Sequence, residues 1–324
     1  MPLMELSLDT TDEAVDWVFT LLAGINYISD IRIAKYTETD LDELANGDDT
    51  QSDWAFTLWL YIPYDTHVNT RRTEVVNLLS SLQRMGISTP VHMTIVEEKT
   101  ANAEVLSPLI RRIGQRFIVL SPDAPYSCEA ADEVPLRLKA SAAFGSGLHP
   151  ATVVCLQLLE RHIIPEMDAL DLGSGSGILS VAMAKLGANV LALDSDRIAV
   201  ESTQDAIHRN EVEQQVKVME GSLGQGSGLG HWMGGNAIEN VPTLEPAASF
   251  DLIAANILAR VHTALAADYR RALRTDAQAG LLITSGFTTE YEDAVATSLQ
   301  DEGFEIVDCE RLNEWVALAF RLKG

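Results

Sequence analysis

A turn with three alternating glycines constrains the fold of this chain more than any other feature of its sequence. Residues 169–187 read ALDLGSGSGILSVAMAKLG, the order expected of a buried strand, a tight turn and a helix. Gly173 and Gly175 let the backbone approach a ligand closely, and Gly177 lets the helix start tight against the sheet. Because the first N–H groups of a helix lack partners within it, the turn predicts a binding site at the helix N-terminus.

A carboxylate follows the next candidate strand. Asp194 comes directly after Asn189 to Leu193, about twenty residues beyond the glycine turn. At that place in a parallel sheet, a carboxylate can accept hydrogen bonds from both ribose hydroxyls of a nucleoside. The turn and Asp194 together predict a nucleoside-binding crevice.

Two rival nucleotide-binding turns do not fit these residues. The dinucleotide fingerprint G-x-G-x-x-G/A requires Gly or Ala where Ile178 or Ser180 stands, depending on the register. A phosphate loop requires G-K-[ST], which does not follow the glycines. The remaining pattern, D-x-G-x-G-x-G from Asp171, resembles the first motif of class I methyltransferases. This resemblance implies S-adenosyl-L-methionine as the cofactor.

Strand-like and helix-like segments alternate between residues 139 and 324, which predicts a doubly wound, Rossmann-like α/β domain with a seven-stranded, mostly parallel sheet. Phe304 to Cys309 and Trp315 to Phe320 flank a short polar turn and predict an antiparallel pair at its end. The glycine-rich connection Gly221 to Ser249 shows no period, and its length predicts a mobile or functional segment. The other candidate strands are Ala169 to Leu172, Asn189 to Leu193, Val216 to Met219, Phe250 to Ala254 and Ala279 to Thr284.

Residues 1–120 predict a smaller α+β domain, which we expect to select the substrate. A capping box from Thr10 to Glu13 precedes apolar residues at helical spacing, which predicts a first helix. Trp54 to Ile62 and Val91 to Val96 have strand patterns, with a helical segment from Thr73 to Met85 between them. Residues 121–138, rich in proline and acidic residues, predict a linker to the domain at 139–324.

Composition narrows the class of partner. The chain has 324 residues, 47 acidic and 23 basic residues and a net charge of −24. This charge repels phosphate backbones, so it disfavours duplex nucleic acid and favours a basic protein, although solvation or adaptation to salt would also explain it. The sequence has no apolar run long enough for a membrane span, and its N-terminus is acidic where a signal peptide would be basic. These two features predict a cytoplasmic protein.

The three cysteines predict neither a disulfide framework nor a metal site. Cys128, Cys155 and Cys309 lie far apart and form no C-x-x-C pair. We expect each to be a small buried apolar residue.

A second motif lies upstream of the glycine turn. Residues 142–160 read AAFGSGLHPATVVCLQLLE, in which a glycine segment precedes an amphipathic helix. From the residues alone, a helix start explains His149 and Pro150 as well as a functional site does. The pattern F-G-[TS]-G-x-H-P-x-T, however, resembles the signature of the PrmA-type ribosomal protein methyltransferases, bacterial enzymes that methylate amino groups of large-subunit ribosomal protein eleven. FDLIAANILARV at 250–261 and the C-terminal GFEIVDCERLNEWVALAFRL resemble the same family.

The resemblance implies a set of site residues. Thr152, Gly173, Asp194 and Asn256 would contact the cofactor or the reacting centre. Asp171 would hold the turn or stabilise the sulfonium at a distance. The segment that closes over the methionine end of the cofactor would comprise Phe144, Gly145, Ser146, Gly147 and His149. The complete predicted cofactor site is Phe144, Gly145, Ser146, Gly147, His149, Thr152, Asp171, Gly173, Gly175, Gly177, Asp194 and Asn256, with no metal.

Asn256 is the predicted catalytic residue. Methyl transfer from a sulfonium needs a neutral amine in line with the methyl group, and the side-chain oxygen of Asn256 can accept a hydrogen bond from the amine N–H. The following Ile257 and Leu258 stand where methyltransferases of planar groups carry prolines, which favours an aliphatic amine. The alternative is that Asn256 caps a helix starting at about Leu258.

Three functions remain open from the sequence. The first is methylation of lysine or α-amino groups of ribosomal protein eleven. Ser146 in place of the commoner threonine, the long Gly221 to Ser249 connection and the divergent N-terminal part leave room for a second, methylation of another protein or of a small amine. The third is a cofactor-binding protein that has lost catalysis.

Overall fold

The structure is a computed structural model. It describes residues 2–11, 14–15, 18, 22, 31–35, 54–84, 86–97, 110–120, 125–138, 149–224, 242–245, 247–275 and 280–323. The chain divides into two compact units, one formed by Met1–Leu109 with Ala140–Phe144 and the other by Ile110–Lys139 with Gly145–Gly324. This division differs from the expected boundary at residue 120 and from the expected linker at 121–138.

The first unit contains a four-stranded antiparallel sheet in the order β2-β3-β1-β4. Its strands are β1 (Leu3–Thr10), β2 (Ile31–Lys35), β3 (Phe56–Pro63) and β4 (His92–Val96), with helix α3 (Val68–Arg84) between the last two. β3, β4 and α3 agree with the predicted segments. β1 is not among the predicted strands, although alternate residues of LMELSLDT are buried, as the period of a half-buried strand requires.

Thr11, and not the predicted Thr10, holds the capping position before the first described helical residues. Thr10 ends β1, and its buried hydroxyl donates to the carbonyl oxygen of Phe56. The hydroxyl oxygen of Thr11 instead accepts the N–H of Ala14 at 3.3 Å, as an N-cap side chain does. Of the residues whose apolar spacing predicts this helix, Val15, Val18 and Leu22 are helical and buried, and Phe19 lies outside the described residues.

The end of the predicted linker belongs to a three-stranded sheet that begins at residue 110. Its strands are β5 (Ile110–Ile113), β6 (Phe117–Leu120) and β7 (Val134–Arg137), and β6 and β7 run parallel. Phe117, Val119 and Leu136 belong to the same buried cluster as the helices of the second unit. The side chain of Asn210 also bonds both the N–H and the carbonyl oxygen of Arg137. These contacts explain why the segment belongs to the second unit.

The second unit is built on a seven-stranded sheet in the order β10-β9-β8-β13-β14-β16-β15. All neighbouring strands run parallel except β16, which is antiparallel to both of its neighbours. The predicted fold class is therefore confirmed. The strands are β8 (Asp168–Leu172), β9 (Asn189–Asp194), β10 (Val216–Glu220), β13 (Leu252–Asn256), β14 (Leu281–Thr288), β15 (Phe304–Leu312) and β16 (Trp315–Leu322).

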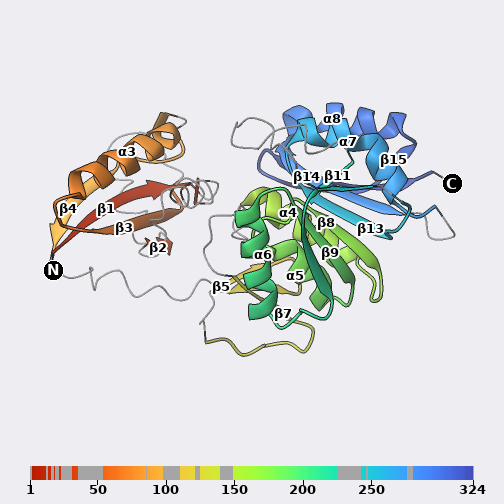
Figure 1. Cartoon of the computed structure of the whole chain (residues 1–324), viewed down its shortest axis with the longest axis horizontal. Helices are drawn as coiled ribbons and strands as arrows, with labels where there is room; N and C mark the ends of the chain where they lie inside the picture. The colour runs from red at the N-terminus through yellow and green to blue at the C-terminus, as the bar shows by residue number, and fades with distance from the viewer. Residues whose placement is uncertain are drawn as a thin grey trace. The chain divides into compact units, whose positions relative to one another are not determined.

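Helices cover both faces of this sheet (Figure 1). On one face lie α4 (Pro150–His162), α5 (Ile178–Lys185) and α6 (Arg197–Arg209), and on the other lie α7 (Ala259–Ala272) and α8 (Thr289–Asp301). Successive residues of the central strands contribute to opposite cores: Ala169 packs with the first group of helices and Leu170 with the second. Strands buried on both faces account for their continuous apolar sequences.

The chain reverses its direction of winding between β8 and β13. From β8 it proceeds outward through β9 to β10, and it then returns to β13 on the other side of β8. In open α/β sheets, ligands bind beyond the carboxyl ends of the strands at such a switch point. The topology therefore predicts a site next to the glycine turn that follows β8.

Three further observations concern the long connection, the cysteines and the helices. The connection from Gly221 to Ser249 contains two short strands, β11 (Ser222–Leu223) and β12 (Thr243–Leu244), which pair in parallel, and residues 225–241 and 246 lie outside the described residues. Cys155 is buried, but Cys128 and Cys309 are exposed, because they lie in an irregular segment and on edge strand β15. Across the described part of the chain, no helix is long and apolar enough to cross a membrane.

Candidate functional site

The three glycines of the turn after β8 all have a left-handed backbone. Their φ angles are 76° for Gly173, 54° for Gly175 and 80° for Gly177. The N–H of Gly173 donates to the carbonyl oxygen of Leu193 at 2.8 Å, which ties the start of the turn to the end of β9. These three positions are glycines because only glycine adopts this backbone without strain.

Two of these glycines also permit close packing. A Cβ atom on Gly173 would lie 2.6 Å from Cγ2 of Ile257, so the turn contacts the chain that follows β13. A Cβ atom on Gly177 would lie 3.0 Å from Cα of Thr203 and 3.2 Å from Cβ of Ala206. Gly177 therefore brings the start of α5 against α6, in addition to the packing of α5 on the sheet.

Asp194 ends β9 and faces the glycine turn. One carboxylate oxygen accepts the N–H of Gly175 and the other accepts the N–H of Asp196, each at 2.9 Å. These two bonds orient the carboxylate at the edge of the turn.

Asp171 is completely buried at the end of β8. Its partner, which the sequence did not reveal, is Ser180 on α5, whose hydroxyl donates to Oδ2. Oδ1 is buried and has no hydrogen-bond partner among the described residues. Burial raises the pKa of Asp171 to about 7, although the Ser180 hydrogen bond lowers it, and the nearby Asp194 raises it further. Asp171 therefore ties the strand to the helix that flanks the glycine turn.

His149 is the N-cap of α4. Its Nδ1 accepts the N–H of Ala151 at 3.2 Å, and Pro150 occupies the first turn of the helix. The imidazole is buried and meets the ring of Trp315 edge-on, with 4.4 Å between the centroids. Burial lowers the pKa of His149 to about 4, so the ring is neutral at physiological pH. The helix start that the residues alone suggested is thus present.

Asn256, the last residue of β13, contacts the first turn of α4. Its Nδ2 donates to the hydroxyl oxygen of the buried Thr152 at 3.2 Å. Its Oδ1 is buried and has no hydrogen-bond partner among the described residues. The helix α7 begins at Ala259 with Leu258 as its N-cap, so the alternative that Asn256 caps this helix is wrong. An acceptor of this kind can bind an incoming N–H group.

Several polar residues near Asn256 were not predicted from the sequence. Ser285, His262 and Tyr269 form a buried hydrogen-bonded group behind β13. Trp315 has a buried indole N–H that no described residue accepts. The sequence signal for Ser285 is weak: it is the polar pair Thr284 and Ser285 at the end of the apolar run of β14.

The predicted site residues therefore fall into three groups. The turn glycines Gly173, Gly175 and Gly177 come together with Asp171 and Asp194. Thr152 and His149 come together with Asn256, and Ile257 joins this group to the turn. Phe144, Gly145, Ser146 and Gly147 lie outside the described residues. No group of side chains suited to hold a metal ion occurs in the described part of the chain.

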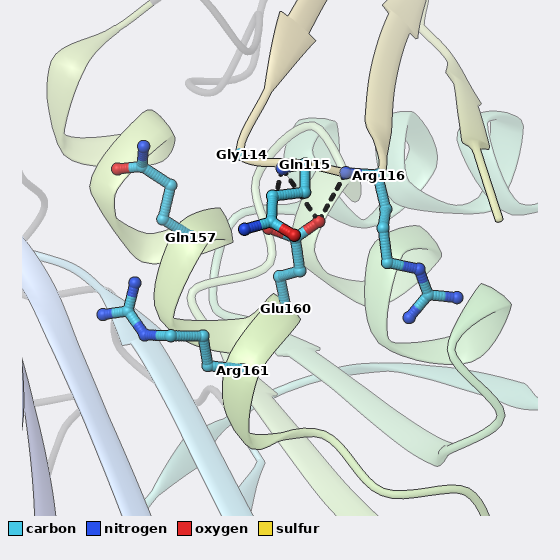
Figure 2. A pocket seen from close by; sticks show the side chains of 6 residues that line it. All are labelled: Gly114, Gln115, Arg116, Gln157, Glu160 and Arg161. Atoms are coloured by element: carbon cyan, nitrogen blue, oxygen red, sulfur yellow. Dashed lines mark hydrogen bonds between the residues drawn. The ribbon is translucent and has the colours of Figure 1, made fainter. Parts of the chain in front are cut away.

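A pocket of about 360 Å³ lies elsewhere, at the C-terminal half of α4 (Figure 2). There the carboxylate of Glu160 accepts the N–H groups of Gln115 and Arg116 and so fixes the β5–β6 turn on α4. Arg161, also in its wall, pairs with Asp308 and Glu310. The polar groups of this pocket thus serve the fold, and His149 and Thr152 lie at the other end of the helix.

The chain was compared with known proteins. A family model described as ribosomal protein L11 methyltransferase (PrmA) matches residues 2–323. The ribosomal protein L11 methyltransferase of Chloroflexus aurantiacus is 38% identical over 327 residues, which cover 98% of this chain and 97% of that protein. The protein of the same name from Herpetosiphon aurantiacus is 37% identical over 328 residues, with 99% of both chains covered.

A solved structure supports the same assignment. The crystal structure of the ribosomal protein L11 methylase from Lactobacillus delbrueckii subsp. bulgaricus matches with a TM-score of 0.54 and 25% identity. The match covers 66% of this chain and 99% of that chain. The resemblance inferred from the motifs is therefore confirmed: the chain belongs to the ribosomal protein L11 methyltransferase (PrmA) family.

Proposed function

We propose that this chain is an S-adenosylmethionine-dependent protein N-methyltransferase that acts on amino groups of ribosomal protein L11. The observation that carries the proposal is the buried Oδ1 of Asn256, an acceptor with no partner among the described residues. It lies at the end of β13, the strand next to β8 and its glycine turn. Membership of the PrmA family and the names of the relatives supply the substrate class.

The residues around the glycine turn fit S-adenosylmethionine. The carboxylate of Asp194 stands at the edge of the turn at the end of β9, the place where a carboxylate accepts hydrogen bonds from ribose hydroxyls. The turn glycines leave the main chain bare, so that a ligand can lie against it. By the family resemblance, the methionine end would be covered by Phe144, Gly145, Ser146, Gly147 and His149, and Thr152 would contact the cofactor or the reacting centre.

The chemistry assigned to the protein is mainly positioning. When bound, S-adenosylmethionine supplies a methyl group on a positively charged sulfur. Asn256 Oδ1 accepts one N–H of the substrate amine, which aims the nitrogen lone pair away from that bond. Since the carboxamide of Asn256 is too weakly basic to take a proton, the proton must leave the amine to solvent before transfer. Alignment then provides most of the rate enhancement.

The charge of the chain supports a basic protein as the substrate. The net charge is −24, and residues 1–109 alone hold 18 of the 47 acidic residues and 6 of the 23 basic residues. Such a field attracts basic partners and repels nucleic acid phosphates. The N-terminal unit is the part we propose to select the substrate. The alternative substrate remains another protein or a small amine.

The test uses methyl-labelled S-adenosylmethionine and purified ribosomal proteins. We expect label on L11 with the parent protein and none with Asn256→Ala, while calorimetry detects binding of the cofactor to both proteins. Label on other lysate proteins but not on L11 would support the alternative substrate. Binding of the cofactor without any transfer by the parent would support a protein that has lost catalysis. Absence of cofactor binding would overturn both the methyltransferase function and the cofactor-binding function.

A further inference from the structure

Ser285 lies where β13, β14 and α4 meet behind Asn256. It is fully buried and stands opposite Asn256 in the β13–β14 register. Its carbonyl oxygen accepts the N–H of Ile257 at 3.0 Å, which fixes the main chain directly after Asn256. Its hydroxyl donates to the carbonyl oxygen of Ala151 at 2.8 Å, which fixes the first turn of α4. Ser285 thus joins two segments that both contact Asn256.

The same turn of α4 determines how the Asn256 side chain is oriented. Thr152 follows Ala151, and its hydroxyl oxygen accepts the Nδ2–H of Asn256 at 3.2 Å. The backbone of Asn256 and the acceptor for its NH2 group are therefore both placed through Ser285. The remaining atom of the carboxamide, Oδ1, has no partner among the described residues. The availability of Oδ1 depends on this arrangement.

His262, in the first turn of α7, bonds Ser285 from the other side. Its Nε2 lies 2.9 Å from the Ser285 carbonyl oxygen, and its Nδ1 lies 3.2 Å from the Tyr269 hydroxyl. A carbonyl only accepts, so Nε2 carries the hydrogen and Nδ1 accepts from Tyr269. Burial lowers the pKa of His262 to about 4, although the backbone groups of Ser285 and Ile257 oppose this shift. The ring is therefore neutral at physiological pH, in one tautomer.

Because Gly286 has no side chain, its main chain lies directly against the peptide of Ile257. Its φ angle is 92°, and a Cβ atom there would lie 2.5 Å from the Ile257 carbonyl oxygen and 2.7 Å from its nitrogen. Two strands that approach this closely allow little shift of the peptide after Asn256. The direct bond between Ser285 and Ile257 is possible because of this approach.

We propose that Ser285 and His262 are positioning residues for methyl transfer, which orient the Asn256 carboxamide so that Oδ1 faces the amine that receives the methyl group. The proposal rests on the proposed function and deepens it, since neither residue itself touches the amine. Because a shift of about 1 Å can lower the rate of an aligned transfer about 100-fold, loss of either residue should act on kcat. Affinity for S-adenosylmethionine should change little.

The first experiment compares Ser285→Ala with Thr284→Val. Thr284 is the preceding residue, is equally buried, and donates its hydroxyl to the carbonyl oxygen of Leu318, away from Asn256. We expect Ser285→Ala to lower kcat for L11 at least about 10-fold, with nearly unchanged affinity for the cofactor, and Thr284→Val to retain most of the activity. Equal losses in the two variants would overturn the proposal.

The second experiment tests His262 by rescue. A glutamine side chain in its place can donate to the Ser285 carbonyl oxygen and accept from Tyr269, whereas a leucine side chain can do neither. We therefore expect His262→Gln to retain much more of the parent kcat than His262→Leu, at similar cofactor affinity. Equal kcat values in the two variants would count against a hydrogen-bonding role for His262.

A third readout does not depend on turnover. One Nδ2 proton of Asn256 is hydrogen-bonded to the Thr152 hydroxyl, so the exchange of the Nδ2 protons with water, followed by NMR, reports the orientation of the carboxamide. We expect faster exchange in Ser285→Ala than in Thr284→Val, and equal rates would overturn the proposal. If the parent fails to methylate L11 while these rates differ, the proposed substrate is wrong but the positioning role of Ser285 stands.

Discussion

At the scale of single residues, Asp171 shows how burial affects a carboxylate beside the glycine turn. Its ordinary pKa is 3.8, and burial raises its pKa in the folded protein to about 7. Between these two values the folded protein holds a proton that the unfolded chain releases. Unfolding is therefore favoured progressively as the pH rises through this interval. Above about pH 7, Asp171 is ionised in both the folded and the unfolded protein, and the loss of stability is complete.

An Asp171→Asn variant should lack this pH dependence. We expect the difference in free energy of unfolding, variant minus parent, to rise between about pH 4 and pH 7 and then to level off. The upper limit is on the order of 4 kcal/mol, since one pKa unit corresponds to about 1.4 kcal/mol. Urea denaturation at a series of pH values measures it.

Ser180 provides a second variant for the same prediction. Its hydroxyl donates to Asp171 and lowers the pKa of that carboxyl, so Ser180→Ala should raise this pKa further. The interval over which stability falls should then extend to higher pH than in the parent. A difference between Asp171→Asn and the parent that stays constant with pH would show that Asp171 is ionised throughout.

At the scale of secondary-structure elements, the glycine turn fixes how α5 meets α6. The turn is bonded twice to Thr203 of α6: Ser174 and Thr203 share a hydrogen bond of 2.9 Å, and the Thr203 hydroxyl donates to the carbonyl oxygen of Gly175 at 3.1 Å. Gly177 contacts Thr203 and Ala206 of α6 closely. The shape of the turn is therefore set by packing between two helices as well as by its glycines.

Gly177→Ala should destabilise the protein through both strain and overpacking. The control is Gly303→Ala, because Gly303 has a similar φ of 90° but no atom within 4 Å of an added Cβ. We expect a cost of about 1 kcal/mol for the control from backbone strain, and a further 1–3 kcal/mol, roughly, for Gly177→Ala. Urea denaturation gives both values.

The same pair of variants distinguishes a role of the turn in binding. Calorimetry should show weaker binding of S-adenosylmethionine by Gly177→Ala and unchanged binding by Gly303→Ala. Equal destabilisation of the two variants would mean that α6 yields to the added methyl group.

At the scale of the whole molecule, charge decides which partners can approach. The net charge of −24 creates a negative field over the surface, and dissolved salt screens it. Contacts between an acidic enzyme and a basic protein therefore weaken as the ionic strength rises, while a chemical step inside the protein changes little.

We expect added NaCl to raise the KM for L11 steadily, with kcat and the affinity for S-adenosylmethionine nearly constant. Steady-state kinetics at salt concentrations on either side of about 0.1 M, where the screening length is about 10 Å, provide the measurement. A series with added sucrose, which carries no charge, serves as the control. A KM that is independent of salt would show that charge does not recruit the substrate.

Local patterns in the sequence were enough to predict the seven-stranded sheet, the glycine turn and the place of Asp194. Turn chemistry and the periods of strands and helices depend on residues that are close in the chain, so they can be predicted from the sequence without knowledge of the fold. The β1 strand has the same kind of local signal, although it was not predicted, because the apolar residues Met4, Leu6 and Leu8 alternate with less buried residues.

The tertiary structure decided what the sequence could not. The bond between Asn256 and Thr152 spans 104 residues and that between Ser285 and Ala151 spans 134, and no local pattern encodes which distant segments meet. The same is true of residues 134–137, which follow a stretch of prolines and acids and resemble part of a linker until pairing with β6 makes them a strand. Composition and spacing thus determined the kind of site, whereas the orientation of its amide came from packing among β13, β14, α4 and α7.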